Sequence, residues 1–327
     1  LRARRTKGVG PGISFGSEMA RRGGGVPQGL IACAHGGTTM EQWDPRGKSR
    51  GGASLYGSML CAWKLTGQPV AGILWYQGES DANEDGAGVY FRRMTDLIRA
   101  VRKDLKQPRL PFLLAQLGRE YNVEDAGEAW NRIQCEQTRL AREIDRVACV
   151  ATVDLPMGDS IHLSSEAQAR LGRRFAAAAD RLVYGNRGEL PPPEIASVRR
   201  LRSPELYNQG DYGLEVTVRN AAGGLCVSRG AVEGAFGLVD PGGKATYPFF
   251  KAEIRGNRIR LDALRNIWEP ENCRLVYGRG RKPPGSLADG RDLAVPVTGP
   301  LPICDPMALT KPFPRWKWCR PAGSRCP

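Results

Sequence analysis

Two short motifs carry residue types that could perform acyl-transfer chemistry. They are WYQGES at positions 75–80 and DSIH at positions 159–162. The second motif places Asp159 three residues before His162, one of only two histidines in the 327 residues. An imidazole can accept a proton from a nucleophilic hydroxyl, and a carboxylate beside it fixes its tautomer. The motif therefore predicts the base, His162, and the orienting acid, Asp159, of a serine-hydrolase site, although Asp159 could also cap its own loop.

Two further segments could bind the negative charge that develops during acyl transfer. A glycine-rich turn at positions 8–12 precedes a helical pattern at 13–22, and backbone N–H groups at a helix start can bind an anion. Gln77 follows an apolar run, where its amide can join an oxyanion hole. Gly78 allows a close approach, and Glu79 can hydrogen-bond to neighbouring loops. An ordinary turn and a solvated charge are the alternative interpretations.

Strand and helix patterns alternate through positions 1–187. Apolar runs predict strands at 28–34, 70–76, 111–117 and 147–155, and helical patterns cover 13–22, 54–65, 94–105 and 165–184. Strands that are apolar on both faces indicate a parallel sheet between helical layers. In such folds the site lies beyond the carboxyl ends of the strands. Gly37 with Thr38, Gln77 with Glu79, and the Asp159/His162 pair all follow predicted strands.

The pattern changes after a proline-rich linker at 188–193. Short β-like runs follow at 194–201, 213–219, 257–261 and 272–277, with turn residues between them. We predict a small β-sandwich at 194–300. Positions 301–327 form a basic tail rich in proline and cysteine.

Composition limits the classes of function. The net charge is +14, but the arginines are scattered and aromatic residues make up 7%, a poor composition for nucleic-acid binding. A basic surface would also suit an acidic sugar. No apolar run approaches the ~20 residues of a membrane span. The nine cysteines form no C-x-x-C pair, so a structural zinc site is not expected, and Cys33, Cys61 and Cys149 are predicted to be buried. No cofactor is predicted. The sequence does not predict an oligomeric state.

The nucleophile is the missing part. Positions 12–16 match the G-x-S-x-G elbow around Ser14, but that elbow needs a buried strand before it, and positions 6–11 cannot form one. Ser80 and Ser160 fit supporting positions better than the nucleophile position. An α/β-hydrolase that uses Ser14 is therefore a weak alternative.

The ordered motifs give the first 187 positions a resemblance to the SGNH (GDSL-type) hydrolases, and within them to the sialate O-acetylesterase-like carbohydrate esterases. GVGPGISFGSEMAR resembles the family's second block, CAHGGTTMEQW its Gly-Gly-Thr…Trp stretch, WYQGESDA its third block and DSIHLS its last. The segment RNIWEPENCRLVYGRGRKPPGSL resembles the family's C-terminal region more loosely.

The resemblance implies a flavodoxin-like three-layer α/β/α fold, no metal, and hydrolysis of O-acetyl esters on sugars such as sialic acid or plant glycans. It implies Asp159 and His162 as acid and base, and Gly10 and Gln77 as oxyanion donors. Gly37, Thr38, Gly78 and Glu79 take supporting positions. It also suggests a secreted, periplasmic or lysosome-like location.

One departure from the family is clear. The family's nucleophile lies in a first block upstream of the glycine turn, whereas only seven residues precede Gly8 and none is serine. We expect the first strand and its serine to lie upstream in a longer parent protein, and the chain as given to have negligible esterase activity. The rival interpretation is a non-catalytic carbohydrate-binding pseudoenzyme.

Overall fold

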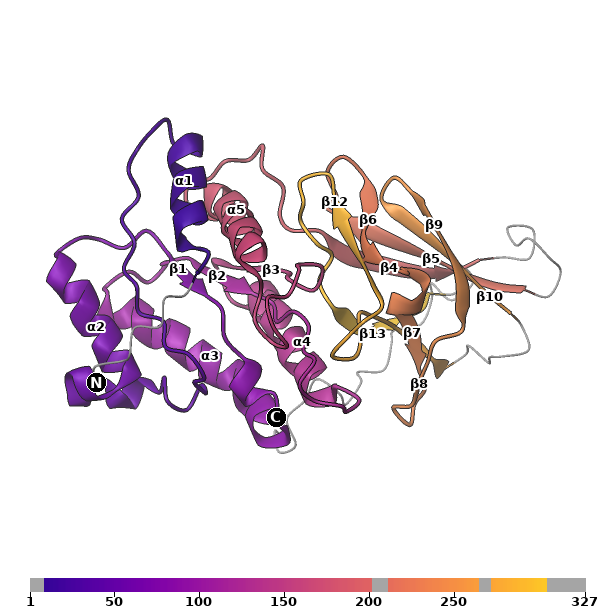
Figure 1. The fold of residues 1–327 in the computed structure, drawn as a ribbon, viewed down its shortest axis with the longest axis horizontal. Coiled ribbons are helices and arrows are strands. Elements are labelled where there is room, and N and C mark those ends of the chain that lie inside the picture. The colour runs from indigo at the N-terminus through magenta and orange to yellow at the C-terminus, as the bar shows by residue number, and fades with distance from the viewer. Residues whose placement is uncertain (1–8, 202–210, 265–271, 305–327) are drawn as a thin grey trace, which may run out of the picture.

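The computed structural model describes residues 9–201, 211–264 and 272–304 of the chain. A mixed α/β region comes first along the chain, and a region made almost entirely of strands follows it (Figure 1). Within the described residues, no helix is long and apolar enough to cross a membrane.

A three-stranded parallel sheet forms the centre of the first region. Its strands are β1 (Ile73–Trp75), β2 (Phe112–Ala115) and β3 (Val147–Val150), in the order β1-β2-β3. Leu74 is in register with Leu113, and Leu114 with Cys149. The carboxyl ends of all three strands therefore lie at one edge of the sheet.

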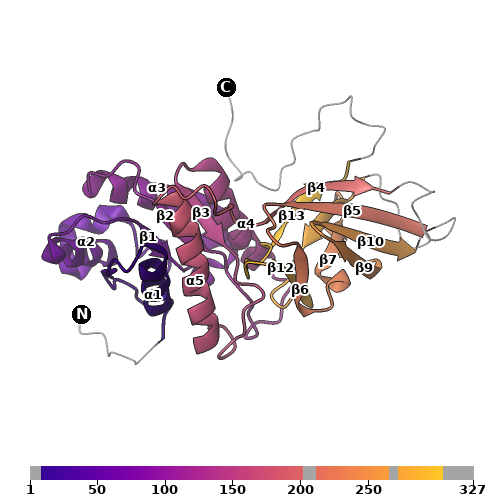
Figure 2. The same cartoon turned by 90° about the horizontal axis from the view of Figure 1, so that it is seen from above.

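The two faces of this sheet bury two separate cores. Phe112 and Leu114 of β2 join one hydrophobic cluster, and Leu113 and Ala115 join the other. This alternation is the period-two geometry of a strand. The first cluster is completed by α2 (Leu55–Thr66), α3 (Glu84–Asp104) and α4 (Glu128–Glu143). The second cluster is completed by α1 (Gly12–Arg22) and α5 (Ser165–Leu182), so the sheet has helices on both faces (Figure 2).

Helix boundaries follow from local sequence. Ser54, Asn83 and Ser164 cap α2, α3 and α5, each accepting a hydrogen bond from a backbone N–H of the first turn. The apolar face predicted for the third helix is buried in α3, where Met94, Leu97, Ile98 and Val101 are at most 1% exposed. Those helix predictions are confirmed.

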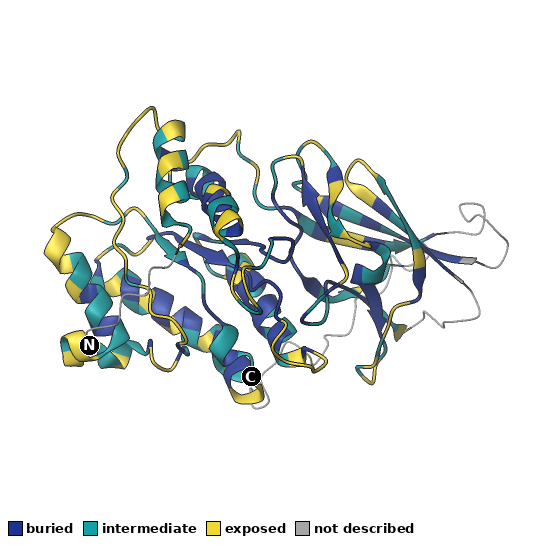
Figure 3. Cartoon of the chain, in the orientation of Figure 1, coloured by how far each residue is buried: buried dark blue, intermediate teal, exposed yellow. Residues whose placement is uncertain are grey.

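One predicted strand is wrong. Residues 28–34 lie in no strand and are mostly exposed, with Leu30 at 50% (Figure 3). A strand needs a hydrogen-bonding neighbour. Within the described residues β1 pairs only with β2, so segment 28–34 finds no partner.

The predicted burial of three cysteines holds only in part. Cys149 is buried and Cys33 is half-buried, but Cys61 is exposed on α2.

The second region contains two four-stranded antiparallel sheets and a two-stranded ribbon. One sheet has the order β4-β5-β10-β9, the other β13-β11-β7-β8, and β6 pairs with β12. Leu214 and Leu261 of the first sheet share a buried cluster with Phe236 and Leu275 of the second. The strands are β4 (Glu194–Arg200), β5 (Asp211–Arg219), β6 (Leu225–Gly230), β7 (Phe236–Val239), β8 (Ala245–Thr246), β9 (Phe249–Arg255), β10 (Arg258–Leu264), β11 (Arg274–Tyr277), β12 (Gly285–Asp289) and β13 (Thr298–Pro302).

The predicted β-like runs correspond to β4, β5, β10 and β11. The β structure continues beyond position 300, since β13 ends at Pro302 and Cys304 pairs with Arg199. The rest of the predicted tail, 305–327, lies outside the described residues.

Buried polar contacts join the two regions. Gln116, which follows β2, exchanges two hydrogen bonds with the backbone of Val297. Arg174 of α5 donates to both carboxylate oxygens of Asp154, at 2.7 and 2.6 Å, and to Asp292 of the second region at 3.1 Å. The side chains of Arg174 and Asp154 are 2% and 0% exposed.

Replacing Arg174 with methionine tests the contribution of this ion pair. We expect the free energy of unfolding to fall by about 3 kcal/mol, because the buried Asp154 carboxylate would keep only its longer contact with Arg170, at 3.3 Å. Urea unfolding measures the change. Arg173→Met, at the exposed neighbouring position of α5, is the matched control and should shift stability by less than about 0.5 kcal/mol. Equal, small shifts in both variants would contradict the account.

Candidate active site

Asp159 and His162 lie in direct contact in the loop before α5. The Asp159 Oδ2 atom is 2.8 Å from Nδ1 of His162. Its Oδ1 atom accepts hydrogen bonds from the backbone N–H groups of Ile161, at 2.9 Å, and His162, at 2.7 Å. Asp159 therefore both caps the loop and orients the imidazole, which leaves Nε2 of the ring for chemistry.

The Asp159 carboxylate is held in its ionised form. The backbone N–H groups of Ile161 and His162, followed by the imidazole, lower the pKa of Asp159 to about 2. The side chains of His162 and Asp159 are nevertheless 76% and 55% exposed. This pair is therefore preorganised and open to solvent.

The turn that carries the pair is anchored on both sides. Gly158 donates its backbone N–H to the carbonyl of His162 at 2.8 Å, and Met157 pairs with Leu163. Leu163 is 6% exposed and packs in the core beneath the turn. These contacts fix the loop although the side chains of Asp159 and His162 are exposed.

Gln77 is the centre of a buried hydrogen-bond network. Its Nε2 donates to the carbonyl of Thr38 at 2.9 Å and to the Asp81 carboxylate at 2.5 Å. Asp81, 1% exposed, also accepts the backbone N–H of Met40. Trp43 donates its indole N–H to the Thr38 hydroxyl at 3.0 Å. The network joins two predicted site segments that are almost 40 residues apart in the sequence.

In this arrangement the Gln77 amide has no N–H left for an oxyanion. Its Oε1 is buried and has no hydrogen-bond partner in the described part of the chain. Its backbone carbonyl accepts from Tyr90 and Gln137, each at 3.0 Å. The role of Gln77 as an oxyanion donor therefore stays a prediction, and it requires the side chain to exchange partners.

Gly78 and Glu79 follow Gln77, and Gly78 occupies a crowded position. Gly78 has a φ of +146°, and a Cβ there would lie 2.8 Å from Cγ2 of Ile133, so only glycine fits. Burial raises the pKa of Glu79, while the charge of the neighbouring His162 opposes that rise.

The remaining predicted residues are less closely connected to the dyad. Gly37 has a φ of +66° in an exposed turn, and Gly10 is exposed just before α1. Their roles also stay predictions.

The nucleophile-elbow interpretation of Ser14 is wrong. Ser14 lies in the first turn of α1, and neither Gly10 nor Pro11 is in a strand, which such an elbow requires. Its hydroxyl donates to the carbonyl of Pro11 at 3.1 Å, on the side of α1 that packs against Gly172 of α5.

No serine hydroxyl in the described ranges is hydrogen-bonded to the His162 ring. Ser160 contributes its carbonyl oxygen, which accepts the backbone N–H of Tyr121 at 2.7 Å. Ser80 lies in the short helix η2 (Glu79–Asp81), where its carbonyl accepts from Asn83.

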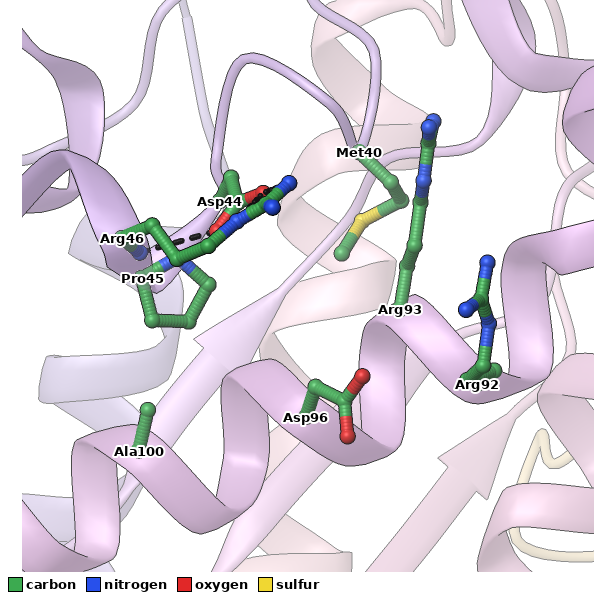
Figure 4. Close-up of a pocket in the computed structure, with 8 residues that line it drawn as sticks. All are labelled: Met40, Asp44, Pro45, Arg46, Arg92, Arg93, Asp96 and Ala100. Atoms are coloured by element: carbon green, nitrogen blue, oxygen red, sulfur yellow. Dashed lines mark hydrogen bonds and ion pairs between the residues drawn. The ribbon is translucent and has the colours of Figure 1, made fainter.

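Two cavities lie elsewhere in the molecule. One, of about 450 Å³, is formed by the segment around Met40 and Arg46 and by Arg92, Arg93 and Asp96 of α3 (Figure 4). The other, of about 700 Å³, lies between α3, α4 and the β-rich region. Neither lining includes the Asp159/His162 pair.

The sequence interpretation missed two site features. Asp81 follows directly after the QGES motif. A carboxylate so close to the end of a strand could have indicated a partner for the Gln77 amide. Tyr121 lies on a segment without periodicity, and the sequence held no signal that would place it against Ser160.

Comparison with known proteins shows what this chain resembles. A family model described as a carbohydrate esterase, sialic acid-specific acetylesterase, matches residues 1–181. A probable carbohydrate esterase of Arabidopsis thaliana is 32% identical over 178 residues, which cover 52% of this chain and 63% of that relative. The matched part thus spans less than two thirds of the relative's length. The crystal structure of a carbohydrate acetylesterase from Xanthomonas citri is similar in fold, with a TM-score of 0.69 and 23% identity, covering 88% of this chain and 64% of that one.

The pKa of Asp159 can be tested by a carboxyl ¹³C NMR titration. We expect a pKa of about 2 in the unaltered chain. In a His162→Ala variant the pKa should stay well below its usual range, because the two backbone N–H groups still stabilise the carboxylate. A pKa that returns to about 4 in the variant would show that the imidazole, rather than the turn, sets it.

Proposed function

This chain belongs to the carbohydrate esterase family of sialic acid-specific acetylesterases, and we propose that it functions in the hydrolysis of O-acetyl esters on sugars by serine-type acyl transfer. The substrate class rests on the family and on the names of the similar proteins from Arabidopsis and Xanthomonas. The observation that carries the mechanism is the 2.8 Å contact between Asp159 and Nδ1 of His162.

His162 acts as the general base and then as the general acid. A serine hydroxyl attacks the acetyl carbonyl while Nε2 of His162 accepts the serine proton. The tetrahedral intermediate collapses when the imidazolium returns that proton to the sugar oxygen, which leaves as a hydroxyl. Water then attacks the acyl-enzyme, His162 accepts the water proton, and acetate departs as the proton returns to serine. Asp159 stays ionised throughout and stabilises the imidazolium.

The nucleophilic serine comes from outside the residues that the structure describes, on a strand that pairs with β1. Two observations support this position. Among the described residues β1 has one neighbour, β2, so its other edge is open for pairing. Segment 26–34 exposes apolar side chains, including Val26 at 57% and Leu30 at 50%, which an added strand could cover. The carboxyl end of such a strand would lie at the edge that carries Gln77 and the dyad.

The oxyanion is held by the backbone N–H of Gly10 and by the Gln77 amide in this proposal. Support for Gln77 comes from its place just after β1, at the edge of the sheet where the turn of Asp159 and His162 also follows a strand. Thr38, Gly37, Gly78 and Glu79 position these donors. The SGNH three-layer arrangement and a separate second domain belong to the same proposal. The two core clusters on opposite faces of the sheet support the first, and the separate buried cluster of the β-rich region supports the second.

One observation favours a second candidate function. Because no described serine reaches His162, the same site could bind an acetylated carbohydrate without hydrolysing it. Acetate release by the native, full-length protein distinguishes the two functions.

Substitution of the dyad provides the principal test. In the native, full-length protein we expect His162→Ala to lower kcat for acetyl-ester hydrolysis by at least about 10³-fold, and Asp159→Asn by about 10³- to 10⁴-fold, since the imidazole loses its orientation. Acetate release from an acetylated sugar measures both. His35→Ala removes the other histidine and should leave the rate unchanged. Unaltered hydrolysis in the His162→Ala variant would overturn the assignment.

A further inference from the structure

Asp81 is a buried carboxylate that contacts the amide of Gln77. It is 1% exposed, and its Oδ2 atom accepts a hydrogen bond from Nε2 of Gln77 at 2.5 Å. The backbone N–H of Met40 donates to Oδ2 at 2.9 Å and to Oδ1 at 3.1 Å. Burial raises the pKa of Asp81, and the hydrogen bonds from Gln77 and Met40 oppose that rise. The carboxylate therefore joins the loop after β1 to the segment around Met40.

Two acceptors determine the orientation of the Gln77 amide. Its Nε2 atom faces the Asp81 carboxylate and the carbonyl of Thr38, at 2.5 and 2.9 Å. Exchanging Nε2 and Oε1 would bring an oxygen against two other oxygens, so both N–H groups must lie on this side. A hydrogen bond to an ionised carboxylate is roughly twice as strong as one to a neutral carbonyl. If one N–H leaves its partner, the bond to Asp81 is therefore the one that stays.

The start of α3 holds Asp81 in place. The backbone N–H of Asp81 donates to the carbonyl of Gly78 at 3.1 Å, and its carbonyl accepts the backbone N–H of Asn83 at 2.8 Å. Gly86, in the first turn of α3, packs against the same carbonyl so closely that a Cβ atom at position 86 would lie 2.5 Å from its oxygen. A side chain at position 86 would therefore displace Asp81.

We propose that Asp81 is a positioning residue for the oxyanion, because it holds one N–H of the Gln77 amide while the other N–H turns from the Thr38 carbonyl to the developing negative charge. Asp81 itself does not contact the substrate. Without this anchor the amide would rotate, and a preorganised donor would be lost. The inference rests on the proposed function and specifies how Gln77 exchanges its partners.

Steady-state kinetics of the native, full-length protein test the role of Asp81. Asp81→Asn keeps the size of the side chain but replaces an acceptor oxygen with an NH2 group, so the anchor of Gln77 is weakened. We expect kcat for acetate release from an acetylated sugar to fall at least about tenfold, with KM within about twofold, because an oxyanion donor acts in the transition state. Asp262→Asn, which changes another buried carboxylate, in β10, is the matched control and should leave kcat unchanged.

A double-mutant cycle shows whether Asp81 acts through Gln77. Gln77→Met keeps the length of the side chain and removes the amide, and we expect it to lower kcat by about 10²- to 10³-fold. In that background Asp81→Asn should change kcat by less than about twofold, since no amide is left to position. A purely structural role would instead lower kcat by the same factor in both backgrounds.

Two glycine variants of α3 separate the position of Asp81 from its chemistry. Gly86→Ala forces a contact with the Asp81 carbonyl and should lower kcat at least about fivefold, since a small displacement misplaces the donor. Gly88→Ala is the matched control, because its Cβ would meet only the Arg132 guanidinium, at 3.9 Å, and it should leave kcat unchanged. Thermal unfolding confirms that each variant is folded.

The Gln77 amide can also be followed without turnover. In the native, full-length protein labelled with ¹⁵N-glutamine, its two Nε2 protons should give one sharp pair of NMR signals, assigned by their absence in Gln77→Met. Asp81→Asn should broaden or split this pair, whereas Asp262→Asn should leave it unchanged.

The outcomes separate this inference from the proposed hydrolysis. An unaltered Gln77 signal pair in Asp81→Asn, an equal loss of kcat in both backgrounds, or equal kcat in the two glycine variants would overturn the positioning role. A released amide with unchanged kcat would also overturn it, while loss of hydrolysis in His162→Ala would still support the esterase. Absence of acetate release by the unaltered native protein would overturn the proposed function, and this inference with it.

Discussion

The buried pair of Arg174 and Asp154 is the constraint on which the rest of the structure depends. Asp154 lies between β3 and the dyad loop, and Arg174 holds it through two hydrogen bonds while donating a third to the carbonyl of Ala151. The same guanidinium reaches Asp292 of the β-rich region. One side chain of α5 therefore fixes the end of the parallel sheet, the start of the functional loop and the neighbouring strands. Such a cluster is stable only when complete, which couples the two regions.

The proposed site residues share one edge of the sheet because parallel strands end at a common edge. The Gln77 network binds the loop after β1 to the Thr38 turn, and the Asp159 turn follows β3 at the same edge. The Gln77 network and the Asp159/His162 pair differ in how far they are buried. Gln77 is buried, with its donors committed, whereas Asp159 and His162 are exposed and already oriented. We infer that Asp159 and His162 already have the orientation that catalysis requires. The proposed oxyanion donor Gln77 needs a change of hydrogen-bond partners first.

Sequence patterns predicted the parallel strands, most helices and the dyad, because periodicity and a short spacing determine them locally. Segment 28–34 was predicted as a strand from its apolar residues, but a strand also needs a neighbour, which no local pattern reveals. Helix α4 was missed because its buried face carries Gln134 and Gln137, whose amides serve the backbone around Leu117 and interrupt the apolar period. Tyr121 is held against Ser160 by a backbone hydrogen bond and by Arg119 at its hydroxyl, and the contact with Ser160 is tertiary, so the sequence could not predict it.

The central claim is that His162 activates a serine outside the described residues. Covalent labelling of the native, full-length protein with a fluorophosphonate probe, followed by peptide mass spectrometry, tests it most directly. The account predicts one modified serine, located outside the described ranges, and loss of labelling in a His162→Ala variant. A label on Ser14, Ser80 or Ser160, or no label at all, would contradict it.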